Sequence, residues 1–285
     1  MFLEGGNASH GYQIASAKIP ILLTLKRVRD LKPHEQTIEE DLDRLKAALA
    51  KDPVLRHPII SDNKTGLVLD GTHRLAALAQ LGCQLVPCAA INYQDPSIVV
   101  ERWFREIRGT SLDNFRDGIK SYESFRVAPK EAENWLENRS GFASIQDTES
   151  CFVLVTASKD ALTLARCSFE IEEMARKRGL KVAYSDDNSV PKGADEFLLS
   201  TIRIDKQEIM AASVAGKVFP PKTTRHIIPS RPLGICFQLK LLRSPYLESA
   251  QEEFVSHLRK LRIRHLPGGA WVGSRRYEEE VFLFE

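Results

Sequence analysis

The residues best suited to chemistry follow one another in the segment VLDGTHR. An apolar run ends at Asp70 and Gly71, and Thr72, His73 and Arg74 then open an Ala/Leu-rich helix pattern. A helix N-terminus presents N–H groups without intrahelical acceptors and a partial positive charge, which together attract anions. Gly71 allows an anion to approach the backbone, while His73 and Arg74 add donors that suit phosphate. The segment therefore predicts a phosphate cradle; the alternative is an ordinary strand–turn–helix with exposed polar side chains.

Asp70 could serve a second purpose, because it ends the apolar run that precedes the helix pattern. Its carboxylate is a candidate ligand for a metal ion, directly or through water, or a partner that orients His73. The helix body that follows, LAALAQLG, needs only a core for its leucines, and Gly82 ends it. The chemistry of this segment is therefore expected in the first turn of the helix.

The scaffold for these residues is predicted as a compact unit of short strands and two helices. Residues 21–28 have the composition of a strand, and after the loop LKPHEQ a helix is expected with a capping box from Thr37 to Glu40. The segments HPIIS and LVLD are expected to pair as strands across the turn DNKTG. A tail over residues 1–20 precedes this domain, which is expected to span residues 21–108.

From Gly109 onward the periodicity is weaker, but strands and helices still alternate. The segments CFVLVTA and ALTLARC are expected to form a hairpin, followed by a helix over residues 168–178. Asp205 is expected to cap a helix that runs through Ala215. Residues 109–285 are therefore predicted as a second α/β domain packed against the first, and the fold class as mixed α/β (α+β).

Composition narrows the classes of protein that fit. The chain has 285 residues, 43% of them hydrophobic, and its 40 Lys and Arg nearly balance its 38 Asp and Glu, for a net charge of +2. Scattered basic residues give no reason to expect nucleic acid as a partner. The five cysteines are odd in number and form no CxxC, which favours reduced thiols. No apolar run reaches the roughly 18 residues of a membrane span, and a cytoplasmic location is expected.

The cradle segment and the small-residue helix after it resemble the signature of the ParB/sulfiredoxin fold over residues 25–105. Sulfiredoxins need a reactive cysteine at the place where this chain has Thr72. Chromosome-partitioning ParB proteins continue into a helix-turn-helix region, which the sequence after residue 105 does not suggest. The segments LKPHEQ, NYQDPSIVVERW and VFPPKTTRHIIP are instead similar to a third branch, the free L-serine kinases.

This resemblance implies a kinase that transfers a phosphoryl group from ADP or ATP to the hydroxyl of free L-serine. The product would be O-phospho-L-serine, for cysteine or siderophore biosynthesis. Mg²⁺ is expected as a cofactor, because phosphoryl transfer needs charge neutralised on the transferred group. The resemblance assigns Glu35 and Asp70 to catalysis and residues 70–74 to the nucleotide. Its substrate-binding candidates are Glu35, Trp103, Lys222, Thr224 and His226.

The residue types fit these roles. Glu35 is expected in a loop from which a carboxylate can reach a substrate, although a solvated glutamate is the alternative. Lys222, Thr224 and His226 alternate, so in an extended segment their side chains would point the same way. Lys222 suits a substrate carboxylate, while Trp103 either walls the pocket or belongs to the core. We therefore expect Lys222 and His226 to face Glu35 across a cleft.

Two other functions stay open at this point. One is a ParB-type nucleotide-binding regulator or DNA-binding protein without kinase turnover; the other is a degenerate kinase relative that binds nucleotide only. The choice between ADP and ATP, the acceptance of homoserine or threonine, and the oligomeric state are not specified by the sequence.

Overall fold

The computed structural model describes residues 11–119 and 121–285. The chain divides into two compact units: the residues up to Val99 together with His226–Glu285 form unit 1, and Val100–Arg225 form unit 2. This division differs from the expected boundary after residue 108. The C-terminal residues return to unit 1, and the strand over Phe104–Arg108 belongs to the sheet of unit 2.

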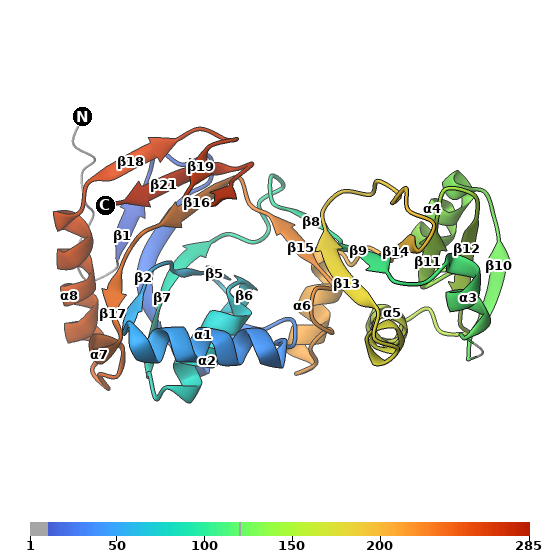
Figure 1. Ribbon diagram of the computed structural model, residues 1–285. Coiled ribbons are helices and arrows are strands. Elements are labelled where there is room, and N and C mark those ends of the chain that lie inside the picture. Colours follow the sequence, from blue (N-terminus) through green and yellow to red (C-terminus); the bar gives the residue numbers. More distant parts are fainter. Residues whose placement is uncertain (1–10, 120) are drawn as a thin grey trace. The chain divides into compact units, whose positions relative to one another are not determined.

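Unit 1 is built on a six-stranded mixed sheet (Figure 1). Its strands, in spatial order, are β1 (Tyr12–Ile14), β2 (Ile21–Arg27), β7 (Leu85–Ile91), β5 (Ile59–Asp62), β6 (Leu67–Asp70) and β3 (Lys32–Pro33). All seven residues of β7 are buried, as expected for a central strand covered on both faces. Strand β5 runs parallel to β7 and antiparallel to β6, so β6 delivers the DGTHR turn at its end.

Helices and short strands complete unit 1. The helices are α1 (Glu39–Lys51), α2 (Thr72–Gln80), α7 (Leu239–Leu242) and α8 (Leu247–Lys260), with a 3₁₀ turn over Val28–Asp30. A three-stranded sheet has the order β16 (Ser230–Leu233), β21 (Glu280–Phe284), β18 (Ile263–Leu266). Two further strand pairs are β17 (Phe237–Gln238) with β4 (Val54–Leu55), and β19 (Trp271–Val272) with β20 (Arg275–Arg276).

The C-terminal segment belongs to unit 1 for a physical reason. Helix α8 packs on β2, where Gln251 Oε1 accepts a hydrogen bond from the backbone N–H of Leu25 at 2.6 Å. Strand β17 pairs with β4, and Phe237 and Phe254 are buried and meet edge to face. The last sixty residues therefore supply part of the hydrophobic core of unit 1.

Unit 2 is built on a second six-stranded sheet, antiparallel throughout its described pairs. Its order is β10 (Glu123–Arg126), β12 (Cys151–Val155), β11 (Ala143–Gln146), β14 (Glu196–Thr201), β9 (Phe104–Arg108) and β13 (Lys181–Ser185). The helices are α3 (Leu112–Asp117), α4 (Pro129–Glu137), α5 (Ala161–Lys177) and α6 (Lys206–Val214). The boundaries between the units fall in β8 (Val99–Glu101) and β15 (Arg225–Ile227).

Three local expectations were wrong. The segment ALTLARC is the first part of α5 and not a strand, because Asp160 caps the helix by accepting from the Thr163 N–H at 2.9 Å. Part of the expected tail, residues 12–14, is strand β1; residues 1–10 lie outside the described part. The predicted Thr37–Glu40 capping box is absent, since α1 begins at Glu39 with Ile38 as its N-cap.

Other expectations were confirmed. The mixed α/β class is correct, and Asp205 caps α6 in a full capping box with Glu208. All five cysteines are free thiols. Among the described residues, no helix has the length and apolar character that crossing a bilayer requires.

Candidate functional site

The turn between β6 and α2 has the backbone geometry of an anion-binding helix start. Gly71 is the N-cap of α2 with φ of 100°, a left-handed conformation that favours glycine. A Cβ at this position would lie 2.7 Å from Ile59 Cγ2 and 2.9 Å from Arg74 Nε. The helix begins at Thr72, so the N–H groups of its first turn point out of its N-terminus. The strand–turn–helix expected for this segment is therefore present, and its role as a phosphate cradle stays a prediction.

Arg74 lies at this turn, but protein groups already hold its guanidinium. It donates to Asp70 Oδ2 at 2.7 Å and to the carbonyl oxygen of Pro58 at 2.5 Å. Asp70 also accepts from Arg231 at 2.5 Å, and Arg231 pairs with Glu279 at 2.6 Å. The four charged side chains thus alternate in sign across the base of the turn.

Electrostatics keeps Asp70 ionised. Burial alone would raise the pKa of its carboxyl, but the adjacent guanidinium groups of Arg231 and Arg74 outweigh that effect and hold the pKa far below its usual range. The same pairing raises the pKa of Arg231 despite its burial. Asp70 is therefore a permanent anion that neutralises two cations.

These contacts do not fit direct coordination of Mg²⁺ by Asp70. The Oδ2 atom is already shared by two guanidinium groups, and Mg²⁺ prefers a near-octahedral oxygen shell. Residues 11–119 and 121–285 contain no group of three or more His, Cys, Asp or Glu side chains arranged to hold a metal. Asp70 is better described as the residue that orients the arginines of the turn.

Two hydrogen bonds attach the loop that carries Glu35 to the same turn. His34 donates from Nδ1 to the Val68 carbonyl at 2.5 Å, and the Ile38 N–H donates to Nε2 of His73 at 2.9 Å. His34 is buried, and its Nε2 lies 3.7 Å from Glu35 Oε1. The loop that carries Glu35, whose side chain is 13% exposed, is therefore attached to β6 and to the first turn of α2.

His226, from the KTTRH segment, joins this cluster within unit 1. Its ring meets the ring of His34 edge to face, with centroids 4.9 Å apart. Its Nε2 lies 2.9 Å from the hydroxyl of Tyr93. His34 thus lies next to both Glu35 and His226. No role was predicted from the sequence for Tyr93 or Arg231.

Those two omissions have different causes. Tyr93 lies in the segment NYQDPSIVVERW and could have been selected from it. Arg231 is 161 positions away from its partner Asp70, and no local pattern marks it. Only the fold of the C-terminal segment onto unit 1 brings this arginine to the cradle.

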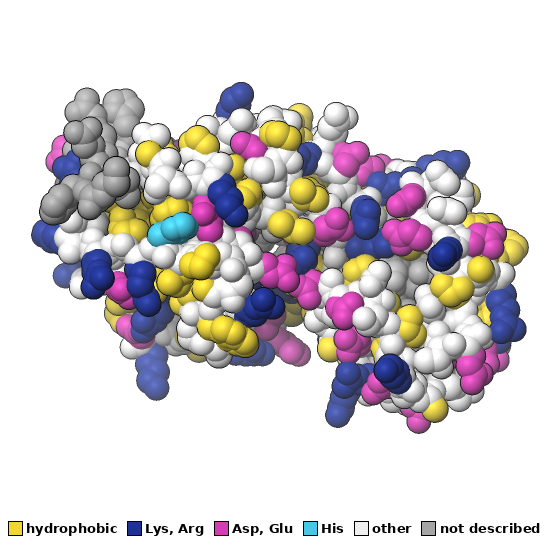
Figure 2. Space-filling view, turned by 90° about the horizontal axis from the view of Figure 1, so that it is seen from above, with side chains coloured by type: hydrophobic (Ala, Val, Ile, Leu, Met, Phe, Trp, Pro, Cys, Tyr) yellow, Lys and Arg dark blue, Asp and Glu magenta, His cyan; other side chains and the backbone are white. Residues whose placement is uncertain are grey.

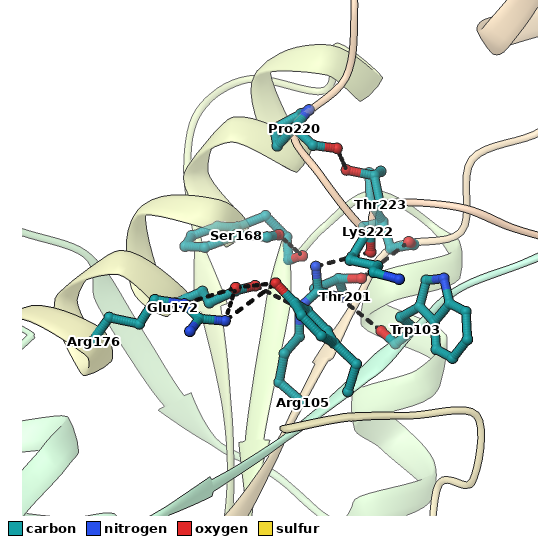
Figure 3. Close-up of polar contacts among 12 residues, drawn as sticks. Trp103, Arg105, Ser168, Glu172, Arg176, Thr201, Pro220, Lys222 and Thr223 are labelled. Carbon is teal, nitrogen blue, oxygen red and sulfur yellow. Dashed lines mark hydrogen bonds and ion pairs between the residues drawn. The ribbon is translucent and has the colours of Figure 1, made fainter. Parts of the chain in front are cut away.

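The substrate candidates Trp103, Lys222 and Thr224 lie in unit 2, and Figure 3 shows Lys222 beside Trp103. The Nζ atom of Lys222 lies 5.0 Å from the centroid of the Trp103 ring, and Arg225 approaches the same ring at 5.6 Å. Thr224 is buried. The Trp103 ring thus lies against two cations, and its role as a wall of the substrate pocket stays a prediction.

The expected alternation of this segment was wrong at its first residue. Lys222 has φ of 57°, in the left-handed region, and lies in a turn before β15 begins at Arg225. The side chains of Lys222 and Thr224 therefore do not project as they would from one extended strand. Their shared action on a substrate stays a prediction.

Comparisons with known proteins show what the chain is similar to in sequence. No family model matches the chain. The chain is 24% identical over 240 residues to the ADP-dependent L-serine kinase SerK of Thermococcus kodakarensis, covering 81% of this chain and 96% of the relative. It is 25% identical over 275 residues to the ATP-dependent L-serine kinase SbnI of Staphylococcus aureus, covering 92% and 97%. The chain is a homologue of the L-serine kinases.

Solved structures support the same fold. A free serine kinase in complex with AMP superposes with a TM-score of 0.66 at 23% identity, over 80% of this chain and 97% of that one. SbnI with a C-terminal truncation superposes with a TM-score of 0.67 at 19% identity, over 84% and 96%. The match to these kinase structures therefore extends across both units.

Proposed function

We propose that this protein transfers the terminal phosphoryl group of ATP or ADP to the hydroxyl of free L-serine, giving O-phospho-L-serine. The observation that carries this proposal is the attachment of the Glu35 loop to the β6–α2 turn by His34 and His73. A carboxylate in a loop attached to a helix start would lie where a general base is needed, next to the reacting phosphate. The sequence similarity to L-serine kinases over most of their length supports serine as the acceptor.

The reaction follows from the chemistry of the two groups. The serine hydroxyl oxygen attacks the terminal phosphorus, and the bond from that phosphorus to the bridging oxygen breaks, which releases ADP from ATP or AMP from ADP. Glu35 takes the hydroxyl proton as the new O–P bond forms. The backbone N–H groups at the start of α2 stabilise the charge on the phosphoryl oxygens.

The network of Arg74, Asp70, Arg231 and Glu279 stabilises the turn between β6 and α2. Asp70 holds Arg74 and Arg231 in fixed positions and cancels part of their charge. A preorganised cationic turn needs no reorganisation during the reaction. Mg²⁺ is proposed to arrive bound to the donor phosphates, and no protein ligand is assigned to it.

Serine recognition is proposed for unit 2 and for His226. Lys222 supplies a cation for the substrate carboxylate, while Thr224 and His226 supply hydrogen-bonding groups. The Trp103 ring positions the Lys222 ammonium from one side. Because Lys222 binds serine and not the donor in this proposal, its loss has a kinetic signature, described in the Discussion.

One assay tests the proposed function. The protein is incubated with L-serine, Mg²⁺ and either ATP or ADP, and O-phosphoserine is measured by mass spectrometry, with homoserine and threonine as competing acceptors. Phosphoserine formed with at least one donor supports the proposal. Nucleotide binding without phosphoserine would favour a regulator, and the DNA-binding alternative is tested by a gel-shift titration at several salt concentrations.

The face drawn in Figure 2 gives little reason to expect DNA as a partner. On the face drawn in Figure 2, Lys and Arg side chains are interspersed with Asp and Glu, as the near-zero net charge suggests. A duplex-binding face usually concentrates basic residues. The cytoplasmic location expected from the sequence stays part of this proposal.

A further inference from the structure

Arg105 on β9 connects the two segments of unit 2 that carry the serine-binding candidates (Figure 3). It is 2% exposed, and each nitrogen of its guanidinium has a protein acceptor. One terminal nitrogen donates to the Trp103 carbonyl at 2.7 Å and the other to the Lys222 carbonyl at 3.0 Å. Nε donates to Glu172 Oε2 at 2.9 Å. A single side chain thus fixes the backbone of Trp103 and Lys222 relative to each other.

Glu172 on α5 fixes Arg105 in turn. Its carboxylate is fully buried, and its other oxygen accepts from Arg176 at 2.9 Å and from the hydroxyl of Tyr184. The ring of Tyr184 lies 5.7 Å from the Nζ atom of Lys222. Tyr184 therefore contacts the buried carboxylate with its hydroxyl and the candidate substrate-binding ammonium with its ring.

Lys222 needs such support because of its backbone. Its φ of 57° is unfavourable for a residue with a side chain, and such conformations persist only where several contacts determine them. The Arg105 bond to its carbonyl is one such contact, and the Thr223 hydroxyl bond to the Pro220 carbonyl at 2.8 Å is another. The left-handed turn directs the Lys222 side chain over the Trp103 ring.

Stability alone does not explain a buried ion pair at this place. Removing two charges from water costs about as much free energy as their attraction returns, so a buried pair adds little net stability. A planar guanidinium with three fixed acceptors does, however, define positions sharply. The main effect of the pair is therefore to fix the positions of the groups that Arg105 contacts.

We infer that the buried Arg105–Glu172 pair is a positioning element for serine recognition: it holds Lys222 and Trp103 in the arrangement that receives the substrate carboxylate. Arg105 touches neither donor nor acceptor and acts only through those two residues. The inference rests on the proposed serine kinase activity and adds the residues that set its affinity for serine.

The test compares Arg105→Lys with a matched control, Arg102→Lys. Arg102 is also buried in unit 2, donates to the Thr201 carbonyl at 2.6 Å and pairs with Glu133, but it has no described bond to Lys222. Lysine keeps the charge of Arg105 and loses the fork that reaches two carbonyls. The measurements are the KM for serine, the KM for nucleotide and the melting temperature.

Arg105→Lys is expected to raise the KM for serine about tenfold or more and to leave the KM for nucleotide within about twofold, since a misplaced substrate group can cost that much. Arg102→Lys is expected to lower the melting temperature about as much as Arg105→Lys does, without a selective rise in the KM for serine. Equal changes in both KM values for Arg105→Lys, or the same split for Arg102→Lys, would overturn the inference.

A second variant covers the case in which Arg105→Lys does not fold. Tyr184→Phe keeps the ring near Lys222 and removes the hydroxyl, which donates to Glu172 and accepts from Arg176. It is expected to raise the KM for serine selectively, by about threefold or more; a folded variant with unchanged KM for serine would overturn the inference. Wild-type protein that makes no phosphoserine in the same assay would instead reject the proposed function, so the two failures are distinguishable.

Discussion

Ile38 donates its backbone N–H to Nε2 of His73 at 2.9 Å. A ring nitrogen that accepts a hydrogen bond carries no proton, so His73 is neutral with its proton on Nδ1. His73 was expected from the sequence to offer donors to phosphate, and the structure leaves Nδ1 as its donor atom. Its other nitrogen ties the first turn of α2 to the loop that carries Glu35, and thereby holds the cradle and the candidate base together.

Arg74→Ala is expected to weaken nucleotide binding by about 1.5–3 kcal/mol, the contribution of one charge-assisted contact. Isothermal titration calorimetry measures this change in nucleotide affinity. Arg56→Ala is the matched control, because Arg56 pairs with Asp52 four residues earlier, as Arg74 does with Asp70. Unchanged nucleotide affinity in Arg74→Ala would mean that Arg74 has only a structural role, through its contacts with Asp70 and the Pro58 carbonyl.

Lys222→Ala is expected to raise the KM for serine far more than the KM for nucleotide, because the proposed partner of the ammonium is the substrate carboxylate. A lower kcat is also expected, since a poorly placed hydroxyl reacts slowly. Steady-state kinetics with each substrate varied in turn gives both values. Lys217→Ala, at an exposed position near the same segment, serves as the control. A larger change in the nucleotide KM would contradict the assignment of Lys222 to serine.

His57 gives the cradle region a pH dependence. Burial, together with the nearby cations Arg74 and Arg231, lowers its pKa from 6.5 to about 4. Its Nδ1 accepts from the Gly234 N–H at 3.1 Å, which also requires the neutral ring. As the pH falls from about 6.5 to 4, the unfolded chain binds a proton that the folded chain does not. The protein therefore becomes less stable, and the equilibrium constant for unfolding rises by up to about tenfold for each pH unit.

Urea denaturation at pH 7.5 and pH 5 checks this effect. Wild-type protein is expected to lose more stability between these two pH values than His57→Gln, which keeps an acceptor but cannot be protonated. Equal losses in the two proteins would mean that His57 contributes nothing to the acid sensitivity.

The local chemistry of the site was predictable from sequence where it depends on neighbouring residues. The DGTHR turn, the left-handed Gly71 and the helix that starts at Thr72 all follow from one short segment. Glu35 was predicted in a loop, and the structure attaches that loop to β6 through His34 and to α2 through the bond between Ile38 and His73. In contrast, ALTLARC has apolar residues compatible with both strand and helix, and the Asp160 cap decided for the helix.

What could not be predicted depends on long-range folding. The return of the C-terminal segment to unit 1 brings Arg231 to Asp70 and His226 to His34, and neither pairing has a local signal. The left-handed turn at Lys222 was also unpredictable, because the contacts that stabilise it come from Arg105 and from the Thr223–Pro220 bond. The assumption that the KTTRH segment is extended, with alternating side chains on one face, was therefore wrong at Lys222.

The most direct test of the central claim is phosphoserine formation by Glu35→Gln, measured beside wild type and Glu39→Gln, an exposed glutamate at the start of α1. Glutamine keeps the size of Glu35 but cannot take the serine proton. We predict that Glu35→Gln lowers kcat by about 100-fold or more, with nucleotide affinity and the melting temperature near those of wild type, while Glu39→Gln remains fully active. Full activity in Glu35→Gln would contradict the claim that the carboxylate held beside the cradle is the catalytic base.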